Sequence, residues 1–217
     1  MLNETNIGAI RTEYDMGQLS EDELAGNPID QFKKWFDEAL EKQVMEPNAM
    51  TLSTVSTAGR PSSRVVLLKE LSETGFGFYT NYQSRKGLEL AGNSQAAVLF
   101  FWPELQRQVR IIGHVVKMSA ERSDAYFQSR PRGSQLGATA SPQSQEIADR
   151  SVLEDYLVAV QKHYVDAELV PRPTHWGGYW LIPEEVEFWQ GRHSRLHDRL
   201  CYKVGEEGGW KVCRLAP

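Results

Sequence analysis

The order of strand-like and helix-like runs is the feature that most limits the folds open to this chain. Strand-like apolar runs occur at residues 50–55, 64–68, 76–80, 96–102, 108–118, 176–182, 186–190, 195–204 and 210–215. Helical patterns occur at residues 28–40, 84–90, 120–129 and 151–165, and Gly92 is expected to close the second helix. The turn residues 57–61, TAGRP, predict a hairpin of the first two strands. A doubly wound parallel sheet would need strand and helix to alternate regularly, and here they do not. Because consecutive strands joined by tight turns favour antiparallel pairing, the pattern predicts an α+β fold, mainly antiparallel β, rolled into a barrel with helices outside.

Two of the expected helices have clear start signals. Asn27 is an N-cap residue that precedes a proline at the first helical position. Ser84 is an N-cap residue that places Arg85 and Lys86 in the first helical turn, where cations oppose the helix dipole. An anion bound at the same helix end would reverse the local field, and a phosphate fits this role. The simpler alternative is that both long side chains extend into water.

Such local positive charge contrasts with the acidic chain around it. The formal net charge is -5, which argues against non-specific nucleic-acid binding. No apolar run approaches the length of a membrane span, and residues 1–10 lack the basic and apolar regions of a secretory signal. The two cysteines fit a reducing compartment. We therefore expect a cytoplasmic protein with neither nucleic acid nor membrane as partner.

The densest positive charge lies at residues 188–199, FWQGRHSRLHDR. If residues 195–200 form a strand, alternate side chains share a face. One face would carry Arg195, His197 and Arg199, and the other Leu196, Asp198 and Leu200. This predicts a cationic face toward a cavity and a mostly apolar face toward the core, with a solvated charged edge strand as the alternative. His193 and His197 would lie about 13 Å apart on such a strand, so no metal site is expected there.

Three further groups suit anions or aromatic rings. Residues 64–69, RVVLLK, form an apolar run with a cation at each end, and residues 126–135, YFQSRPRGSQ, gather Tyr, Arg and Ser at a helix end. The second mixture suits a phosphate. Residues 107–108 and 143–144 add polar groups that could recognise the carbonyls and nitrogens of a ring. Nicotinamide, P-loop, serine-hydrolase and zinc motifs are all missing, so a phosphorylated cofactor together with a phosphorylated substrate is the interpretation that remains.

These motifs occur together, in order and spacing, in one family. RVVLLK, FYTNYQSRK, RQVR, YFQSRPRGSQLGA and FWQGRHSRLHDR through the terminal RLAP resemble the pyridoxine (pyridoxamine) 5′-phosphate oxidases over nearly the whole chain. The resemblance implies an FMN-binding split β-barrel with surrounding helices, which forms a homodimer with two active sites at the subunit interface. Residues 28–217 would form a single domain that ends in a dimerisation and substrate segment at 175–217. Residues 1–27 would form a flexible N-terminal arm or lid.

The resemblance also implies which residues form the site. The FMN-binding residues would be Arg64, Val65, Leu68, Lys69, Tyr79, Thr80, Arg85, Lys86, Gln108, Gln143, Ser144, Trp189 and Arg199. The substrate would be bound by Arg11, Tyr14, Lys69, Tyr126, Arg130, Ser134, Arg195 and His197. Of these, Lys69, Tyr126, Arg130 and Ser134 would hold its phosphate. Arg195 and His197 would be the catalytic residues, because they would lie against the substrate's ring and its reacting carbon.

The implied activity is hydride transfer from C4′ of pyridoxine 5′-phosphate or pyridoxamine 5′-phosphate to N5 of the flavin. The products would be pyridoxal 5′-phosphate, hydrogen peroxide formed from O2, and ammonia from the amine substrate. Three alternatives stay open: another split-barrel flavoprotein such as a flavin reductase, a carrier of vitamin B6 phosphates, and an RNA-binding module with aromatics beside basic residues. The acidic net charge disfavours the RNA-binding module.

The cysteines raise a separate question about pairing. If residues 205–209 form a hairpin loop, Lys203 pairs with Lys211 and Cys201 lies opposite Cys213. Directly opposed strand residues are about 4.5–5.5 Å apart at Cα, which is within disulfide range. Two reduced cysteines remain the expected state in a cytoplasmic protein.

Overall fold

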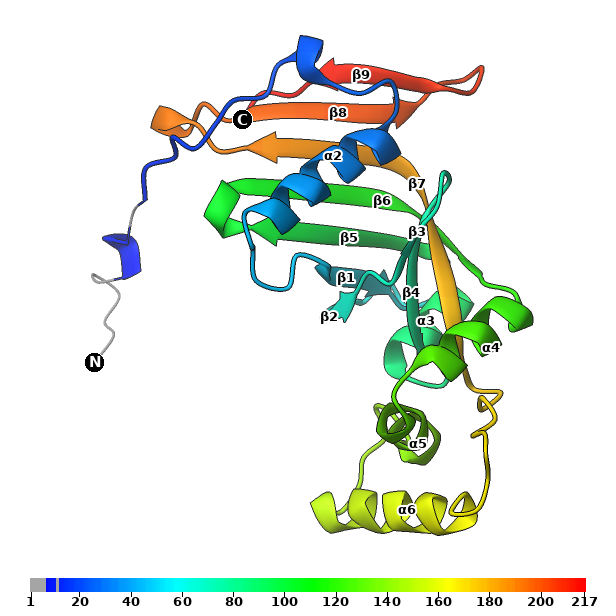
Figure 1. Cartoon of the computed structure of the whole chain (residues 1–217). Coiled ribbons are helices and arrows are strands. Elements are labelled where there is room, and N and C mark those ends of the chain that lie inside the picture. The colour runs from blue at the N-terminus through cyan, green and yellow to red at the C-terminus, as the bar shows by residue number, and fades with distance from the viewer. Residues whose placement is uncertain (1–6, 11) are drawn as a thin grey trace. The chain divides into compact units, whose positions relative to one another are not determined.

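The computed structural model describes residues 7–10 and 12–217 (Figure 1). Its strands are β1 Ala49–Val55, β2 Pro61–Leu67, β3 Glu70–Leu71, β4 Phe76–Asn81, β5 Gln95–Trp102, β6 Arg107–Lys117, β7 Trp176–Gln190, β8 Asp198–Val204 and β9 Trp210–Arg214. Its helices are α2 Pro28–Glu41, α3 Arg85–Gly92, α4 Ala120–Ser129, α5 Arg132–Ala140 and α6 Arg150–His163, with 3-10 turns η1 Glu21–Glu23, η2 Pro103–Leu105 and η3 His193–Arg195.

The strands are hydrogen-bonded in the order β2-β1-β5-β6-β7-β4-β3, while β8 pairs with β7 and β9 pairs with β8. The pairs β1–β2, β3–β4, β4–β7, β7–β8 and β8–β9 are antiparallel. The predicted α+β class, mainly antiparallel, is therefore confirmed. None of the helices within residues 7–10 and 12–217 has both the length and the apolar character that crossing a membrane requires.

The chain clusters into two compact units. Unit 1 contains the described residues up to 47 together with 99–111 and 184–217, and unit 2 contains residues 48–98 and 112–183. Strands β5, β6 and β7 each continue along the chain from one unit into the other.

Unit 2 begins with the predicted hairpin of β1 and β2. The register pairs Ala49 with Leu67 and Val55 with Pro61. The turn between them needs Gly59, whose φ of 76° lies in the left-handed region, and the N–H of Gly59 donates to the Ser56 carbonyl at 2.9 Å. Strand β4 lies between β3 and the first part of β7, and its Phe76 and Phe78 are fully buried.

The helices of unit 2 follow their capping signals closely. The Ser84 hydroxyl accepts from the Gly87 N–H, so α3 begins where predicted, but its C-cap is Asn93 rather than Gly92. Helix α4 has the predicted bounds, residues 120–129. Helix α5 was not expected, because its sequence RGSQLGATA is rich in glycine and has no side-chain N-cap bond. A cluster of Phe127, Leu136, Val170 and Trp176 forms the core beneath α4 and α5.

Unit 1 is built around α2, whose predicted N-cap is confirmed. The Asn27 side chain accepts from the Asp30 N–H at 2.9 Å. Figure 1 shows α2 crossing the strands of this unit, and its apolar stripe makes aromatic contacts with them. The Trp35 ring meets the Phe188 ring edge-on at 5.1 Å, and Phe32 lies 4.9 Å from Phe100. These contacts fix the helix on the sheet.

Strand β7 corrects one prediction from the sequence. It runs unbroken over 15 residues, where two separate strands were expected. Proline normally interrupts a sheet because it has no N–H to donate. Pro183, however, lies between the part of β7 that pairs with β4, which ends at Leu181, and the part that pairs with β8, which begins at Glu185.

Strand β8 corrects a second prediction. It begins at Asp198, and residues 191–197 form the loop that joins it to β7. Ser194 and Arg195 have φ of 54° and 62°, which lie in the left-handed region and outside the extended range of regular strands. Leu196 is 71% exposed. The expected alternation of two faces over residues 195–200 is therefore wrong.

The end of the chain follows its predicted register. Lys203 pairs with Lys211, and Cys201 pairs with Cys213 across β8 and β9. Both thiols are free. Cys201 is fully buried, and burial raises its pKa to about 12.

Candidate functional site

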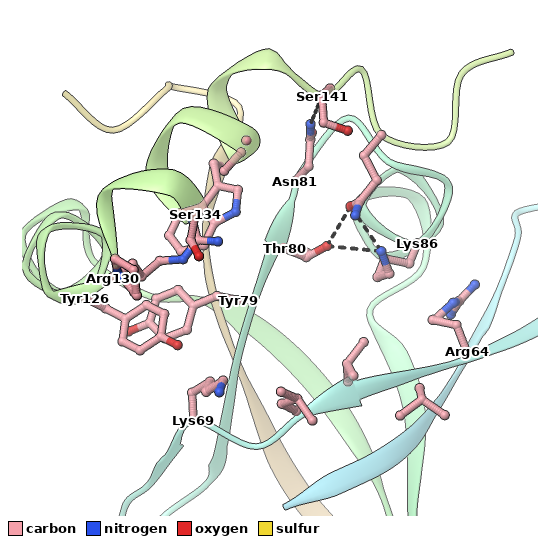
Figure 2. Close-up of a pocket in the computed structure, with 18 residues that line it drawn as sticks. Arg64, Lys69, Tyr79, Thr80, Asn81, Lys86, Tyr126, Arg130, Ser134 and Ser141 are labelled. Atoms are coloured by element: carbon pink, nitrogen blue, oxygen red, sulfur yellow. Dashed lines mark hydrogen bonds between the residues drawn. The ribbon is translucent and has the colours of Figure 1, made fainter. Parts of the chain in front are cut away.

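Unit 2 contains a cavity of about 710 Å³ that gathers most of the predicted phosphate and flavin residues (Figure 2). Of the residues predicted for the substrate phosphate, all four line it: Lys69, Tyr126, Arg130 and Ser134. Of those predicted for FMN, it is lined by Arg64, Val65, Lys69, Tyr79, Thr80, Lys86 and Gln143. Strands β2 and β4 and helices α3, α4 and α5 supply most of these side chains.

One side of the cavity is aromatic and carries a buried cation. The rings of Tyr79 and Tyr126 stack at 3.8 Å with an interplanar angle of 11°. The guanidinium of Arg130 lies 4.7 Å from the centre of the Trp176 ring. Its Nη1 is buried and has no hydrogen-bond partner among the described residues. An unpaired buried donor is costly, so this nitrogen suits an anionic ligand such as phosphate.

The two tyrosines of this wall stay protonated. Burial raises the pKa of Tyr126, and burial followed by the hydrogen bond to Glu70 raises that of Tyr79. Glu70 accepts from the Tyr79 hydroxyl and also pairs with Arg122. Glu70 was not predicted, yet it fixes the orientation of the Tyr79 ring.

The other side of the cavity is polar and centred on Lys86. Figure 2 shows Lys86 and Thr80 close together there. The Lys86 Nζ lies 3.2 Å from both the Thr80 hydroxyl and the Gln143 Oε1. Burial, and then the charge of Arg64, lowers the pKa of Lys86. The ammonium group is thus held in place at a site where a further anion would be favourable.

A recess of about 270 Å³ adjoins this polar side. It is lined by Ser62, Ser63, Arg64, Arg85, Lys86, Gln143 and Ser144, and three of these residues also line the larger cavity. It lies at the first turn of α3, where the sequence predicted an anion. Leu68 lines neither cavity: its side chain is 7% exposed, and its N–H donates to the Asn48 carbonyl.

Unit 1 holds a second group of predicted residues. The His197 ring lies 4.6 Å from that of Trp189 and 5.5 Å from that of Tyr14. The His197 Nδ1 accepts from the Arg192 N–H at 3.1 Å, which leaves the ring proton on Nε2. Burial and the charge of Arg195 lower the pKa of His197, against the opposing effect of Asp198. The neutral imidazole is therefore the favoured form.

The N-terminal arm contacts the loop that carries Arg195. Tyr14 and Arg195 line one cavity of about 490 Å³, together with Gly8, Ile10, Thr12, Glu13, Arg192 and Ser194. The Gln106 Oε1 accepts from the N–H groups of Asp15 and Met16 at 2.9 and 3.1 Å, which holds the arm at this point. Arg11, predicted to bind substrate, lies outside the described residues.

The last two predicted residues of unit 1 adjoin a carboxylate that sequence reasoning missed. Arg199 donates to both oxygens of Glu187 at 2.7 and 3.2 Å, and Glu187 is 5% exposed. Gln108 and Trp189 line a cavity of about 100 Å³ beside Glu187. The strand pattern gave no sign that Glu187 would be buried.

Comparison with known proteins decides the family. The sequence model described as "Pyridoxamine 5′-phosphate oxidase" matches residues 36–164, more than half of the chain. The chain belongs to the pyridoxamine 5′-phosphate oxidase family. Residues 176–217 match the "Pyridoxine 5′-phosphate oxidase C-terminal dimerisation region". The predicted family is therefore confirmed, and the chain is an enzyme of that family.

Curated members of the pyridoxamine 5′-phosphate oxidase family match nearly the whole chain. A pyridoxine/pyridoxamine 5′-phosphate oxidase from Cupriavidus pinatubonensis is 54% identical over 213 residues, which are 98% of this chain and 100% of the relative. Another from Salinibacter ruber is 52% identical over 98% of this chain and 100% of the relative.

Solved structures support the same fold. PhzG from Burkholderia lata 383, solved with tetrahydrophenazine-1-carboxylic acid, is 34% identical, with a TM-score of 0.85 over 90% of this chain and 95% of PhzG. A pyridoxamine 5′-phosphate oxidase-related, FMN-binding protein from Nostoc punctiforme is 17% identical, with a TM-score of 0.69 over 89% of this chain and 100% of that protein. The predicted split-barrel fold is confirmed by this likeness.

Proposed function

We propose that this chain is an FMN-dependent oxidase that converts pyridoxine 5′-phosphate and pyridoxamine 5′-phosphate to pyridoxal 5′-phosphate. O2 is the electron acceptor, hydrogen peroxide is released, and the amine substrate also yields ammonia. The observation that carries the proposal is the buried Nη1 of Arg130, which has no hydrogen-bond partner within residues 7–10 and 12–217. Arg130 shares its cavity with Lys69, Tyr126 and Ser134. Family membership and the curated relatives support the same reaction.

The residues present fit FMN. The larger cavity, of about 710 Å³, lies within the usual size range of ligand pockets. Arg64 and Lys86 line both this cavity and the smaller recess, where Arg85 adds a third cation suited to a phosphate. Gln143 and Ser144 offer polar groups beside them. When bound, FMN supplies the acceptor for the hydride that leaves the substrate.

The aromatic side of the cavity would hold the substrate phosphate. Arg130 offers a buried guanidinium nitrogen, and Tyr126 offers a hydroxyl whose raised pKa keeps it a donor. Lys69 and Ser134 line the same space. Charged and neutral donors directed at one group favour a phosphorylated substrate over its unphosphorylated alcohol or amine, because those compounds would leave Arg130 unpaired.

Arg195 and His197 are proposed to act at the reacting carbon. Arg195 would orient the C4′ oxygen or nitrogen of the substrate through its charge. His197, neutral with its proton on Nε2, would donate from that atom while the Arg192 N–H fixes its ring. Residues 1–27, including Tyr14, are proposed to act as a lid, and the C-terminal match supports a homodimer.

The first test is peroxide production. The purified protein should show a flavin spectrum and form hydrogen peroxide with pyridoxamine 5′-phosphate but not with simple amines. Flavin binding without turnover would indicate a carrier, and turnover with reduced nicotinamide alone would indicate a flavin reductase. A colourless protein with no affinity for FMN would contradict the proposal altogether.

The roles of Arg195 and His197 need a separate test. Flavin-reduction kinetics of Arg195→Leu and His197→Asn should show slower reduction or weaker substrate binding, because each variant loses a donor to the substrate. Unchanged reduction rates and substrate affinity in both variants would remove these residues from the mechanism.

A further inference from the structure

Glu89 is a buried carboxylate in α3 that no family motif assigned to the site. It is 8% exposed and lies at the fifth position of the helix. Its Oε2 accepts from the hydroxyls of Thr54 and Ser62 at 2.5 and 2.6 Å and from Arg64 at 3.3 Å. Its Oε1 accepts from the Arg85 Nε at 3.0 Å. Two of the three arginines predicted to bind FMN, Arg64 and Arg85, thus converge on one carboxylate.

The contact with Arg64 is reinforced by two hydroxyl bridges. The Arg64 Nη1 donates to the Thr54 hydroxyl at 2.6 Å, and the Nη2 donates to the Ser62 hydroxyl at 2.5 Å. Each hydroxyl in turn donates a hydrogen bond to Glu89. A guanidinium held through three routes to the same carboxylate has one orientation, which turns Arg64 from a flexible side chain into a fixed part of the cavity wall.

The contact between Glu89 and Arg85 keeps the Arg85 side chain at the recess, although the helix dipole and its exposure favour its extension into water. Arg85 stands in the first turn of α3, where the helix dipole repels a cation, and its side chain is 64% exposed. Glu89, four residues further on, bonds its Nε. Because this bond uses Nε, a ligand in the recess that Arg85 lines could be bound by the two terminal nitrogens of its guanidinium.

Charge balance gives the arrangement a second purpose. Arg64, Arg85 and Lys86 all line the same recess, and the charge of Arg64 already lowers the pKa of Lys86. Burial raises the pKa of Glu89, but the hydrogen bonds from Ser62, Thr54 and the two arginines outweigh it and lower the pKa to about 2. One ionised carboxylate thus reduces the repulsion among three cations and still leaves the recess positive.

We propose that Glu89 is a positioning residue for the phosphate group of FMN, which it serves by fixing Arg64 and Arg85 at the recess. This inference rests on the proposed function, because it requires that FMN binds in this cavity. It assigns no chemical step to Glu89, whose carboxylate is directed at the two arginines and not at the ligand.

The test compares two flavins that differ only in the phosphate. Dissociation constants of FMN and riboflavin are measured for the apoprotein by quenching of flavin fluorescence. Glu89→Gln should weaken FMN binding roughly tenfold, the worth of about one charge-assisted hydrogen bond, and leave riboflavin binding within about twofold. Glu154→Gln is the matched control, since Glu154 forms the same i,i+4 pair with Arg150 on exposed α6 and should change neither constant.

A second variant guards against misfolding of Glu89→Gln. Thr54 is buried and lines neither cavity, and valine has nearly the same shape. Thr54→Val removes one bridge between Arg64 and Glu89, so it should also weaken the binding of FMN more than that of riboflavin. Equal weakening of FMN and riboflavin, or no change in FMN, would overturn the positioning role. A wild-type protein that binds no FMN would instead overturn the proposed function, so the two failures are distinct.

Discussion

At the scale of single residues, the site depends on partners that fix charge and orientation. His197 is an example, because its Nδ1 accepts a hydrogen bond from the Arg192 N–H. The charge of Arg195 lowers the pKa of His197, and the charge of Asp198 raises it. Protonating Nδ1 would break the bond with Arg192, so the folded state disfavours the imidazolium. The structure therefore links the protonation of His197 to the geometry of its loop.

This linkage predicts how His197 titrates. Its pKa should lie below 6.5, because burial and Arg195 both lower it. Arg195→Gln should raise the pKa and Asp198→Asn should lower it further. A His with a depressed folded pKa stabilises the folded state above about pH 6.5, and this contribution is lost as the pH falls. NMR titration of the His197 imidazole in the three proteins tests this order of pKa values. An unchanged pKa in Arg195→Gln would contradict the prediction.

Sequence reasoning located the cations of the site but not the carboxylates that hold them. Residue type and the family resemblance pointed to Arg64, Arg85 and Arg199, and the structure places each at a cavity or beside one. Their partners Glu89 and Glu187 were missed. The chain has 29 acidic residues, and nothing in a sequence without an alignment distinguishes a buried carboxylate from a solvated one.

At the scale of elements, sequence predicted the helix starts and the tight turn that depend on neighbouring residues. The N-caps at Asn27 and Ser84 and the hairpin around Gly59 depend on neighbouring residues, and all three are confirmed. The alternation of polar and apolar residues at 195–200 predicts a strand, but residues 195–197 lie in the loop before β8. The loop contains two left-handed residues, Ser194 and Arg195, and its ends are set by the pairing of Gln190 with Asp198, a tertiary contact that local alternation does not reveal.

Helix α3 offers a prediction at this scale. A Cβ on Gly87 would lie 2.7 Å from the Asn81 carbonyl oxygen, so the helix can approach β4 only with glycine there. Gly87→Ala should lower the free energy of unfolding by roughly 1–3 kcal/mol despite the better helix propensity of alanine. It should also weaken FMN binding, because Arg85 and Lys86 move with the helix.

The matched control for Gly87→Ala is Gly133→Ala in α5, where a Cβ would meet no atom within 4 Å. That variant should be neutral or more stable by about 0.4–1 kcal/mol, since alanine reduces the freedom of the unfolded chain. Urea unfolding of both proteins supplies the comparison. Equal effects of the two substitutions would show that the close approach at Gly87 is not limiting.

At the scale of the whole molecule, folding lowers the pKa of several carboxyl groups in both units. Hydrogen bonds from Arg214 lower the pKa of Glu21 to about 2, and the network around Arg64 lowers that of Glu89 to the same range. Asp30 and Asp149 are shifted in the same direction by side-chain hydrogen bonds. Each of these groups binds a proton more readily in the unfolded chain, so acid favours unfolding.

The resulting prediction concerns the pH dependence of stability. A carboxyl whose pKa falls from 4.5 to about 2 on folding, as for Glu89, contributes stability above pH 4.5 that is lost as the pH drops toward 2. The free energy of unfolding in urea should therefore fall between pH 5 and pH 3. Glu89→Gln should be less stable at neutral pH but show a shallower acid slope, by up to about 1.4 kcal/mol per pH unit.

Glu154→Gln is the control and should keep the wild-type slope, because Glu154 is exposed in its pair with Arg150. A wild-type slope in Glu89→Gln would mean that folding does not lower the pKa of Glu89, which would contradict its hydrogen bonds with Arg64 and Arg85.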